Sequence, residues 1–434
     1  MSRAAGTTPE RASFRDVFAV GEFRALWASQ VLSAGGDRLA LVALTLLVYD
    51  RTRSPLMAAV AFAAGTLPYI VGALFLSGLA DRCPRRTVMV AADAARMVLV
   101  AAMLVPRVPL DALIALLYAV TAVQPAFDSA KSAIVRDIVP GRLFPMAIGV
   151  IQSTARTLIV AGAAAGGLIV AVAGARVALG IDAASFAASG LIVQAALKPR
   201  PAPDQAGENR GSLASLTRGA RLVFGDKALR TLMLFGWLAA FYEVPSALAA
   251  PYASKLGGGP VAAGLLIAST QLGSVAAMPY FTKRIGPLTR LRWMGPMAVC
   301  ASLVLVLAVL RPGLAVSMAV FAVANVFTVY QIAANTAFVE RVPNERRGQA
   351  FGLANAGLVV GQGAGFAIAG AAAEVLSPSA VIALAGGLGA VIACGLALGW
   401  RRALPAVGRH SARRLRRDAL ATRQEPVQIG RVRG

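Results

Sequence analysis

The sequence is poor in the residues on which many catalytic and metal sites depend. It contains one histidine, His410, near the C-terminal end, and three widely separated cysteines, Cys83, Cys300 and Cys394. Neither the spacing of a zinc site nor a disulfide framework is present. A histidine-based catalytic site within the apolar part of the chain is excluded. We therefore expect neither catalytic residues nor a bound metal, and we do not expect an enzyme.

Two further absences narrow the function. The sequence has no Gly-x-x-x-x-Gly-Lys-Ser/Thr phosphate-binding loop, which argues against an ATP-driven pump. Acidic residues are scarce, with 20 Asp and Glu against 43 Lys and Arg, giving a net charge of +23. Such an excess could indicate nucleic-acid binding, but the basic residues gather in alternate loops between apolar runs, as membrane topology requires. We expect no nucleic-acid partner.

Long apolar runs dominate the sequence. Hydrophobic residues make up 57% of the chain, and the mean hydropathy is +0.68. About twenty apolar residues suffice for a helix to cross a bilayer, and the alternating pattern of barrel strands is absent. The sequence predicts an all-α polytopic membrane protein. Its twelve predicted spans are 25–49, 56–79, 87–105, 112–134, 146–172, 177–197, 230–252, 261–282, 293–310, 313–335, 349–374 and 379–400.

A polar break divides the predicted spans into two sets of six. Residues 198–229 form a cytoplasmic linker in which Leu213, Leu216, Ala220 and Val223 recur at helical spacing, predicting an amphipathic helix on the inner leaflet. The even-numbered loops are basic, which places both termini in the cytoplasm. The remaining predicted regions are an N-terminal segment (1–24), helical bundles at 25–197 and 230–400, and a basic, solvated tail (401–434) drawn to anionic lipid.

Charged residues within apolar spans are costly and are therefore functional candidates. Asp37 lies near the middle of the first span, and Glu243 near the middle of the seventh. Pro245 and Pro251 on the seventh span loosen backbone hydrogen bonding, so we expect this span to bend. Two carboxylates at similar depth could face one cavity and bind protons, a cationic substrate, or both. The alternative for each is structural: Asp37 pairs with a neighbouring helix, and Glu243 is a satisfied buried acid.

Two other sets of opposite charges lie within the predicted spans. Asp93 and Arg96 lie three residues apart on the third span, so they can meet on one helix face and neutralise each other. Arg156 in the fifth span and Asp182 in the sixth could pair between helices. The spacing of the first pair favours a structural role.

The hinge between the second and third spans carries a recognisable motif. It reads Ser77-Gly-Leu-Ala-Asp-Arg-Cys-Pro-Arg-Arg86 and resembles the signature loop of the major facilitator superfamily, with Ser77 and Pro84 where that family usually has glycine. An ordinary positive-inside turn is the alternative. Other segments fall in the order seen in the enterobactin-exporter and macrolide-efflux-like branch of the superfamily, including Phe23–Ser33, Ile181–Phe186 and Arg346–Gly348.

The resemblance implies a fold of two pseudo-symmetric six-helix bundles and several residue roles. A conformational latch would comprise Asp81, Arg82, Arg85, Arg86 and Asp128. The fourth and tenth helices line the cavity in this fold, which adds Gln124, Asn325 and Gln331 to Asp37 and Glu243 as candidate proton-coupling or substrate residues. In the fifth span, Gly162, Gly166 and Gly167 resemble the antiporter motif, with Ala163 in place of its proline. They would be gating glycines; plain close packing is the alternative.

The resemblance also implies a function. We expect proton-coupled efflux of a small amphipathic or cationic compound, such as a drug, a macrolide or a siderophore-like molecule, by alternating access. We expect a monomer in the cell membrane, in contact with lipid. An ion gradient, of protons, would drive transport, and no cofactor is expected. A non-transporting sensor or scaffold on the same fold is one alternative, which the costly intramembrane acids disfavour. An importer of a small metabolite is another.

Overall fold

The computed structural model describes residues 13–76, 78–201, 213–343 and 346–424, and every secondary-structure element in them is a helix. The side chains of Asp81, residues 213–216 and residues 403–424 are not described. Within the described residues, ten helical segments are long and apolar enough to cross a membrane, and a bent helix pair is an eleventh candidate. The chain is therefore a multi-pass membrane protein.

The N-terminal half is built around α2, the first long helix. It packs against α8 and α9, while α6 packs against α7 and α9. Although α6 corresponds to the third predicted span, it is not among the ten candidates, and it carries two charged residues near its middle, Asp93 and Arg96. The helices of this half are α1 (Phe14–Ala19), α2 (Gly21–Thr52), α3 (Pro55–Ala63), α4 (Leu67–Phe75), α5 (Leu79–Arg82), α6 (Arg85–Met103), α7 (Leu110–Ile138), α8 (Phe144–Ala173) and α9 (Ala175–Ala196).

The C-terminal half has its own packed core. There α15 packs against α17, and α16 packs against α17, α18 and α20. Its helices are α10 (Leu213–Gly225), α11 (Lys227–Trp237), α12 (Ala239–Tyr242), α13 (Val244–Ala247), α14 (Ala249–Lys255), α15 (Pro260–Arg284), α16 (Pro287–Val306), the 3₁₀ helix η1 (Leu307–Leu310), α17 (Leu314–Phe327), α18 (Tyr330–Arg341), α19 (Arg347–Val375) and α20 (Pro378–Gln424).

Two regions that the sequence singled out are helical here. Residues 213–225 form α10, which confirms the helix expected from the periodicity, and Gly219 packs closely against the carbonyl oxygen of Gln349 on α19. The basic region that follows the last span continues α20 as far as Gln424. Contact of either region with lipid stays a prediction.

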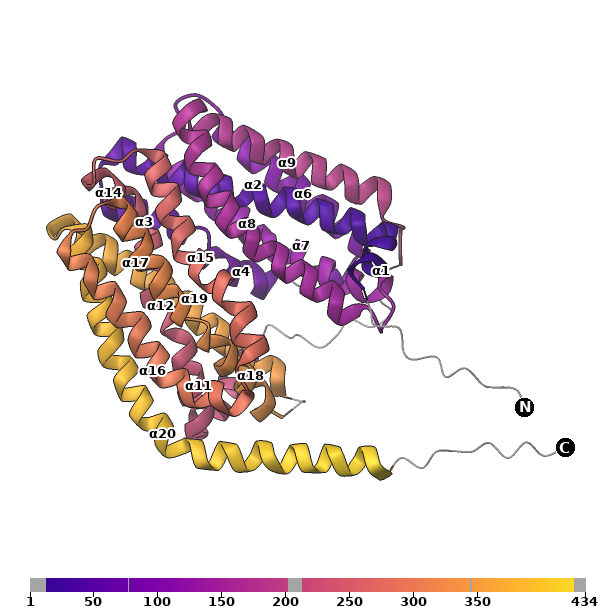
Figure 1. Cartoon of the computed structure of the whole chain (residues 1–434). Helices are drawn as coiled ribbons and strands as arrows, with labels where there is room; N and C mark the ends of the chain where they lie inside the picture. Colours follow the sequence, from indigo (N-terminus) through magenta and orange to yellow (C-terminus); the bar gives the residue numbers. More distant parts are fainter. Residues whose placement is uncertain (1–12, 77, 202–212, 344–345, 425–434) are drawn as a thin grey trace.

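The two halves meet at the end of the molecule where α2 stops and α3 starts, and their helices diverge from there (Figure 1). Helix α3 packs against α19, and α8 packs against α15. Gly167 on α8 and Gly264 on α15 permit the second contact, because a Cβ atom at Gly167 would lie 2.5 Å from the carbonyl oxygen of Pro260 and 2.9 Å from Cα of Gly264. Helices in lipid approach this closely through small residues.

A carboxylate also joins the halves at this end. Glu374, near the end of α19, accepts a hydrogen bond from the backbone N–H of Leu56 at 3.1 Å and another from the Ser54 hydroxyl. Ser54 is the N-cap residue of α3, and the exposed N–H groups of a first helical turn favour an anion. Hydrogen bonding and glycine packing thus close the same end of the molecule.

The seventh predicted span is interrupted by breaks. Its two parts, Lys227–Ala247 and Ala249–Lys255, meet at an angle of 43°. Pro251 lacks a backbone N–H and cannot donate to the carbonyl of Ala247, which explains a break at Leu248. The expected bending of this span is confirmed, and Glu243 lies in the irregular stretch between α12 and α13.

An ion pair joins Asp226, just before α11, to Arg341 at the end of α18. Asp226 is the N-cap residue and accepts hydrogen bonds from the backbone N–H groups of Ala228 and Leu229, and Arg341 at the end of α18 binds its other oxygen at 3.0 Å. Burial favours a higher pKa for Asp226, but these hydrogen bonds and the Arg341 charge outweigh it, so the pKa lies below its ordinary value. Asp226 thus stays ionised at neutral pH and joins α11 to α18.

The contact between α8 and α15 predicts a selective effect of adding one methyl group. Gly167→Ala would push backbone against backbone, and overpacking of this kind costs roughly 1–3 kcal/mol. Gly149→Ala on the same helix is the matched control, because a Cβ atom there meets nothing within 4 Å. We expect the purified Gly167→Ala variant to melt at a lower temperature than both the wild type and the control. Equal melting of the two variants would contradict the contact.

Candidate functional site

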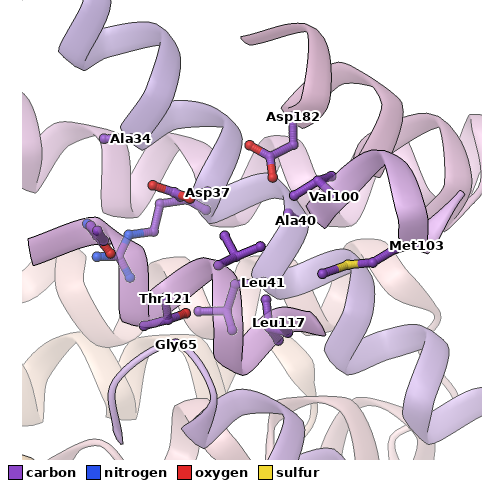
Figure 2. Close-up of a pocket in the computed structure, with 13 residues that line it drawn as sticks. Ala34, Asp37, Ala40, Leu41, Gly65, Val100, Met103, Leu117, Thr121 and Asp182 are labelled. Carbon is purple, nitrogen blue, oxygen red and sulfur yellow. The ribbon is translucent and has the colours of Figure 1, made fainter. Parts of the chain in front are cut away.

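Asp37 projects from the middle of α2 into a small cavity within the N-terminal half. This cavity, which we call the acid cavity, has a volume of about 50 Å³. Figure 2 shows Asp37 and Asp182 on one side of it and the apolar side chains of Leu41, Leu117 and Met103 on the other. The Asp37 side chain remains 21% exposed, so this intramembrane acid has access to the cavity.

Arg96 on α6 organises the charges around the acid cavity. Its guanidinium binds Asp93 at 2.5 Å and reaches Asp37 at 3.4 Å, while its side chain is only 1% exposed. The rings of Phe127 and Phe186 lie 5.0 and 4.4 Å from the guanidinium carbon, in cation–π geometry. The expected pairing of Asp93 with Arg96 is therefore present, and Arg96 also draws Asp37 into the same network.

Asp182 on α9 is fully buried and only partly hydrogen-bonded. Its Oδ2 atom has no hydrogen-bond partner among the described residues, although Asp182 lines the acid cavity. Gly36 makes room for it, since a Cβ atom at Gly36 would lie 2.3 Å from Oδ1 of Asp182. Asp182 and Arg156, whose pairing the sequence left open, do not form an ion pair: Arg156 is exposed on α8, and no described cation forms a salt bridge with Asp182.

Glu243 lies in a second cavity, between the two halves. Gln271 Nε2 donates to one carboxylate oxygen of Glu243 at 2.7 Å, and the Ser246 hydroxyl donates to the other at 3.3 Å. This interhalf cavity has a volume of about 200 Å³. Residues of α2, α3 and α8 line it on one side, and residues of α13, α15 and α19 on the other.

Arg38 separates the two cavities. It follows Asp37 on α2 and lines both the acid cavity and the interhalf cavity. Successive residues of a helix point about 100° apart, which explains how Asp37 faces one cavity while Arg38 reaches the other. The structure therefore does not bring Asp37 and Glu243 into one cavity; it places them in neighbouring cavities that share Arg38.

The predicted polar cavity residues divide into two groups. Gln124 on α7 lines the acid cavity. Asn325 is buried on α17, where its amide donates to the Phe321 carbonyl oxygen at 3.2 Å, and neither Asn325 nor Gln331 lines either cavity. Sequence reasoning did not single out Gln271 and Gln362, which do line the interhalf cavity. Both were visible as intramembrane amides, but the sequence could not show which way they face.

The residues of the predicted latch lie in separate contacts. Arg85 pairs with Asp137 on α7, and Arg86 donates to the backbone carbonyl of Gln194 on α9. Asp128 binds Lys131 at 2.7 Å and accepts a hydrogen bond from the Tyr69 hydroxyl at 3.3 Å. Arg82 is exposed, and the side chain of Asp81 lies outside the described part of the structure. The latch stays a prediction.

The three predicted gating glycines face different partners. Gly162 and Gly166 pack against α2, where added Cβ atoms would lie 2.6 Å from Cβ of Arg38 and 3.1 Å from Cβ of Val42. Gly167 packs against α15 of the opposite half, as described above. Close packing is thus present at all three positions, and a gating role stays a prediction.

Comparison with known proteins places this architecture in a family. The sequence profile of the Major Facilitator Superfamily matches residues 26–332. The chain belongs to the major facilitator superfamily. Superfamily members are transporters rather than enzymes. The multidrug efflux pump Tap of Mycolicibacterium fortuitum is 28% identical over 233 residues, and this match spans about half of each protein, 49% of this chain and 55% of the relative.

Solved structures of the same fold agree. A POT family transporter in complex with 5-aminolevulinic acid superimposes with a TM-score of 0.70 at 10% identity, covering 92% of this chain and 98% of that one. A bacterial homologue of the iron transporter ferroportin, in an inward-facing state, gives a TM-score of 0.62 at 14% identity, covering 89% and 99%. At such identities, the likeness shows the superfamily fold alone.

The Arg96 network predicts a large cost for removing its cation. Arg96→Ala would leave Asp93 and part of Asp37 without a cation in a dry environment, a loss typically worth about 3–5 kcal/mol. Asp50→Asn is the control, because the Asp50–Arg53 pair is exposed and such pairs contribute about 0–1 kcal/mol. We expect Arg96→Ala, but not Asp50→Asn, to lower the folded yield and the melting temperature in detergent strongly. Wild-type stability of this variant would refute the role of Arg96.

Proposed function

We propose that this chain is a secondary active transporter that exports a small amphipathic or cationic compound in exchange for protons. The observation that carries the proposal is the placement of Asp37 and Glu243. One acid comes from each half, and both line cavities that meet at Arg38. An exporter needs ionisable groups that exchange protons near a substrate cavity, whereas a scaffold has no such need.

The surroundings of the two acids favour proton exchange over a purely structural role. Asp37 has one long contact, 3.4 Å, with Arg96, which binds Asp93 more closely. Glu243 accepts hydrogen bonds from neutral groups and forms no ion pair with a described cation. Neither carboxylate is fully compensated, so gaining a proton would relieve a real electrostatic cost.

Proton binding could bias the two conformations of an alternating-access cycle. Moving one elementary charge across the full membrane potential changes its free energy by about 2.3 kcal/mol per 100 mV. A free-energy change of this size alters the relative populations of two conformations substantially. The conformation described here has the halves in contact at the α2–α3 end and diverging elsewhere (Figure 1). We propose that it is the inward-facing state.

The proposed topology follows from the same arrangement. Adding α6 and the bent pair to the ten other candidates gives twelve spans, six in each half. The polar character of α6 then reflects the Arg96 network inside the N-terminal bundle. We propose that both termini are cytoplasmic and that the protein resides in the cell membrane, because the basic loops lie on that side. The name of the relative Tap supports drug efflux.

The proposal predicts loss of coupling when either acid is neutralised. Asp37→Asn and Glu243→Gln should abolish efflux driven by a pH gradient, measured with ethidium, erythromycin and the zwitterion norfloxacin, while membrane insertion and folded yield stay at wild-type levels. Asp111→Asn is the matched control, an acid exposed in the first turn of α7. Efflux would be measured in cells lacking their own drug pumps and in proteoliposomes. Gradient-driven transport by both variants at the wild-type rate would eliminate these acids as coupling groups.

A further inference from the structure

Arg38 is a cation inside the membrane-spanning region that forms no ion pair with any described carboxylate. The charges of Asp37 and Glu243 both act on it, but neither carboxylate lies within salt-bridge distance. A guanidinium presents several donors in a planar fork suited to a carboxylate. An arginine placed in this way on a cavity wall is available to an anionic group of a ligand.

Glu243 supplies the opposite charge in the same cavity. Its two oxygens are oriented by Gln271 and Ser246, which are neutral, so its negative charge is positioned without being cancelled. Arg38 and Glu243 come from different halves of the molecule and line one interhalf cavity. The cavity therefore offers one positive and one negative site that do not neutralise each other directly.

The rest of the cavity wall is largely apolar. Phe62 on α3 and Phe366 on α19 meet edge to face with ring centroids 5.5 Å apart, and both line the interhalf cavity. Val42 and Ile267 add aliphatic surface. Such a wall suits an aromatic or aliphatic body between two charged ends. The volume of about 200 Å³ limits the enclosed portion of the ligand to a small molecule.

We propose that the interhalf cavity binds zwitterionic amphipathic compounds, with a ligand carboxylate at Arg38 and a ligand ammonium group at Glu243. The proposal rests on the proposed function, because it takes this cavity as the substrate site. It narrows the substrate class, since a ligand with only a positive charge leaves Arg38 uncompensated and experiences its repulsion. A ligand with only a negative charge meets the same difficulty at Glu243.

The turn of α2 that carries Arg38 is packed tightly against α8. Gly162 on α8 packs against it so closely that a Cβ atom there would lie 2.6 Å from Cβ of Arg38. Contact at this point holds the arginine-bearing turn of α2 against α8 before any ligand arrives. Because the backbone at Arg38 is already held in place, binding of a ligand needs to order only the arginine side chain.

Binding of charge-matched probes to the purified full-length protein tests the proposal without any gradient. Norfloxacin carries a carboxylate and a piperazinium group; its ethyl ester retains only the cation, and N-acetylnorfloxacin only the anion. A second series uses 4-(aminomethyl)benzoate, its methyl ester and its N-acetyl derivative. We expect at least one zwitterion to bind roughly tenfold more tightly than both of its single-charge derivatives, as charge-assisted pairing at two sites requires.

Two variants test which protein charge binds which charge of the ligand. Arg38→Gln should remove the preference for the zwitterion over the ester, and Glu243→Gln should remove its preference over the N-acetyl compound. Arg156→Gln, which changes an exposed arginine on α8, should leave both preferences unchanged. If Arg38 served only to adjust the proton affinity of nearby acids, its substitution would shift the pH dependence of binding equally for all three probes. Three results would each overturn the proposal. They are an equal shift in the pH dependence for all three probes in Arg38→Gln, an ester that binds as tightly as its zwitterion, and no binding in either series.

The outcomes also separate this proposal from the proposed function. Gradient-driven ethidium efflux without zwitterion preference would leave the transporter assignment intact and remove the substrate class. Zwitterion preference without gradient-driven movement would support the binding site and remove proton coupling.

Discussion

A charged side chain inside an apolar helix must find an opposite charge, a hydrogen bond or water. Asp93 and Arg96 meet this constraint with a close ion pair packed against two phenylalanine rings, although Nε of Arg96 has no hydrogen-bond partner among the described residues. Asp37, Arg38 and Glu243 satisfy it only in part, and each lines a cavity. We propose that this contrast separates charges that hold the helices together from charges that bind ligand and protons.

The packing of the helices supports the same division. Small residues let α8 approach α2 and α15, so one helix fixes the turn that carries Arg38 and also closes one end of the molecule. Glu374 reinforces that end from α19 by binding the first turn of α3. The contacts between the halves at this end do not involve the Arg96 network, which lies entirely within the N-terminal half.

Much of the fold followed from apolar runs, and less of the site did. Long hydrophobic segments predicted the membrane-spanning helices, and the prolines of the seventh span predicted its bend. The sequence placed Asp37 and Glu243 inside helices, but the direction in which each side chain points depends on helix rotation, which no local pattern specifies. The amides show this well: Asn325 binds its own helix, whereas Gln271, which was not singled out, orients Glu243. Asp182 and Arg156 likewise lie apart because their helices turn those residues in different directions.

The account depends on carboxyl groups that change protonation inside the membrane-spanning region. Infrared difference spectroscopy of the reconstituted protein across a pH titration measures this directly, through the stretching band of protonated carboxyl groups. We expect a band that appears as the pH falls, with part of it missing in Asp37→Asn and another part missing in Glu243→Gln. A carboxyl band that is the same in the wild type and both variants at every pH would contradict the account.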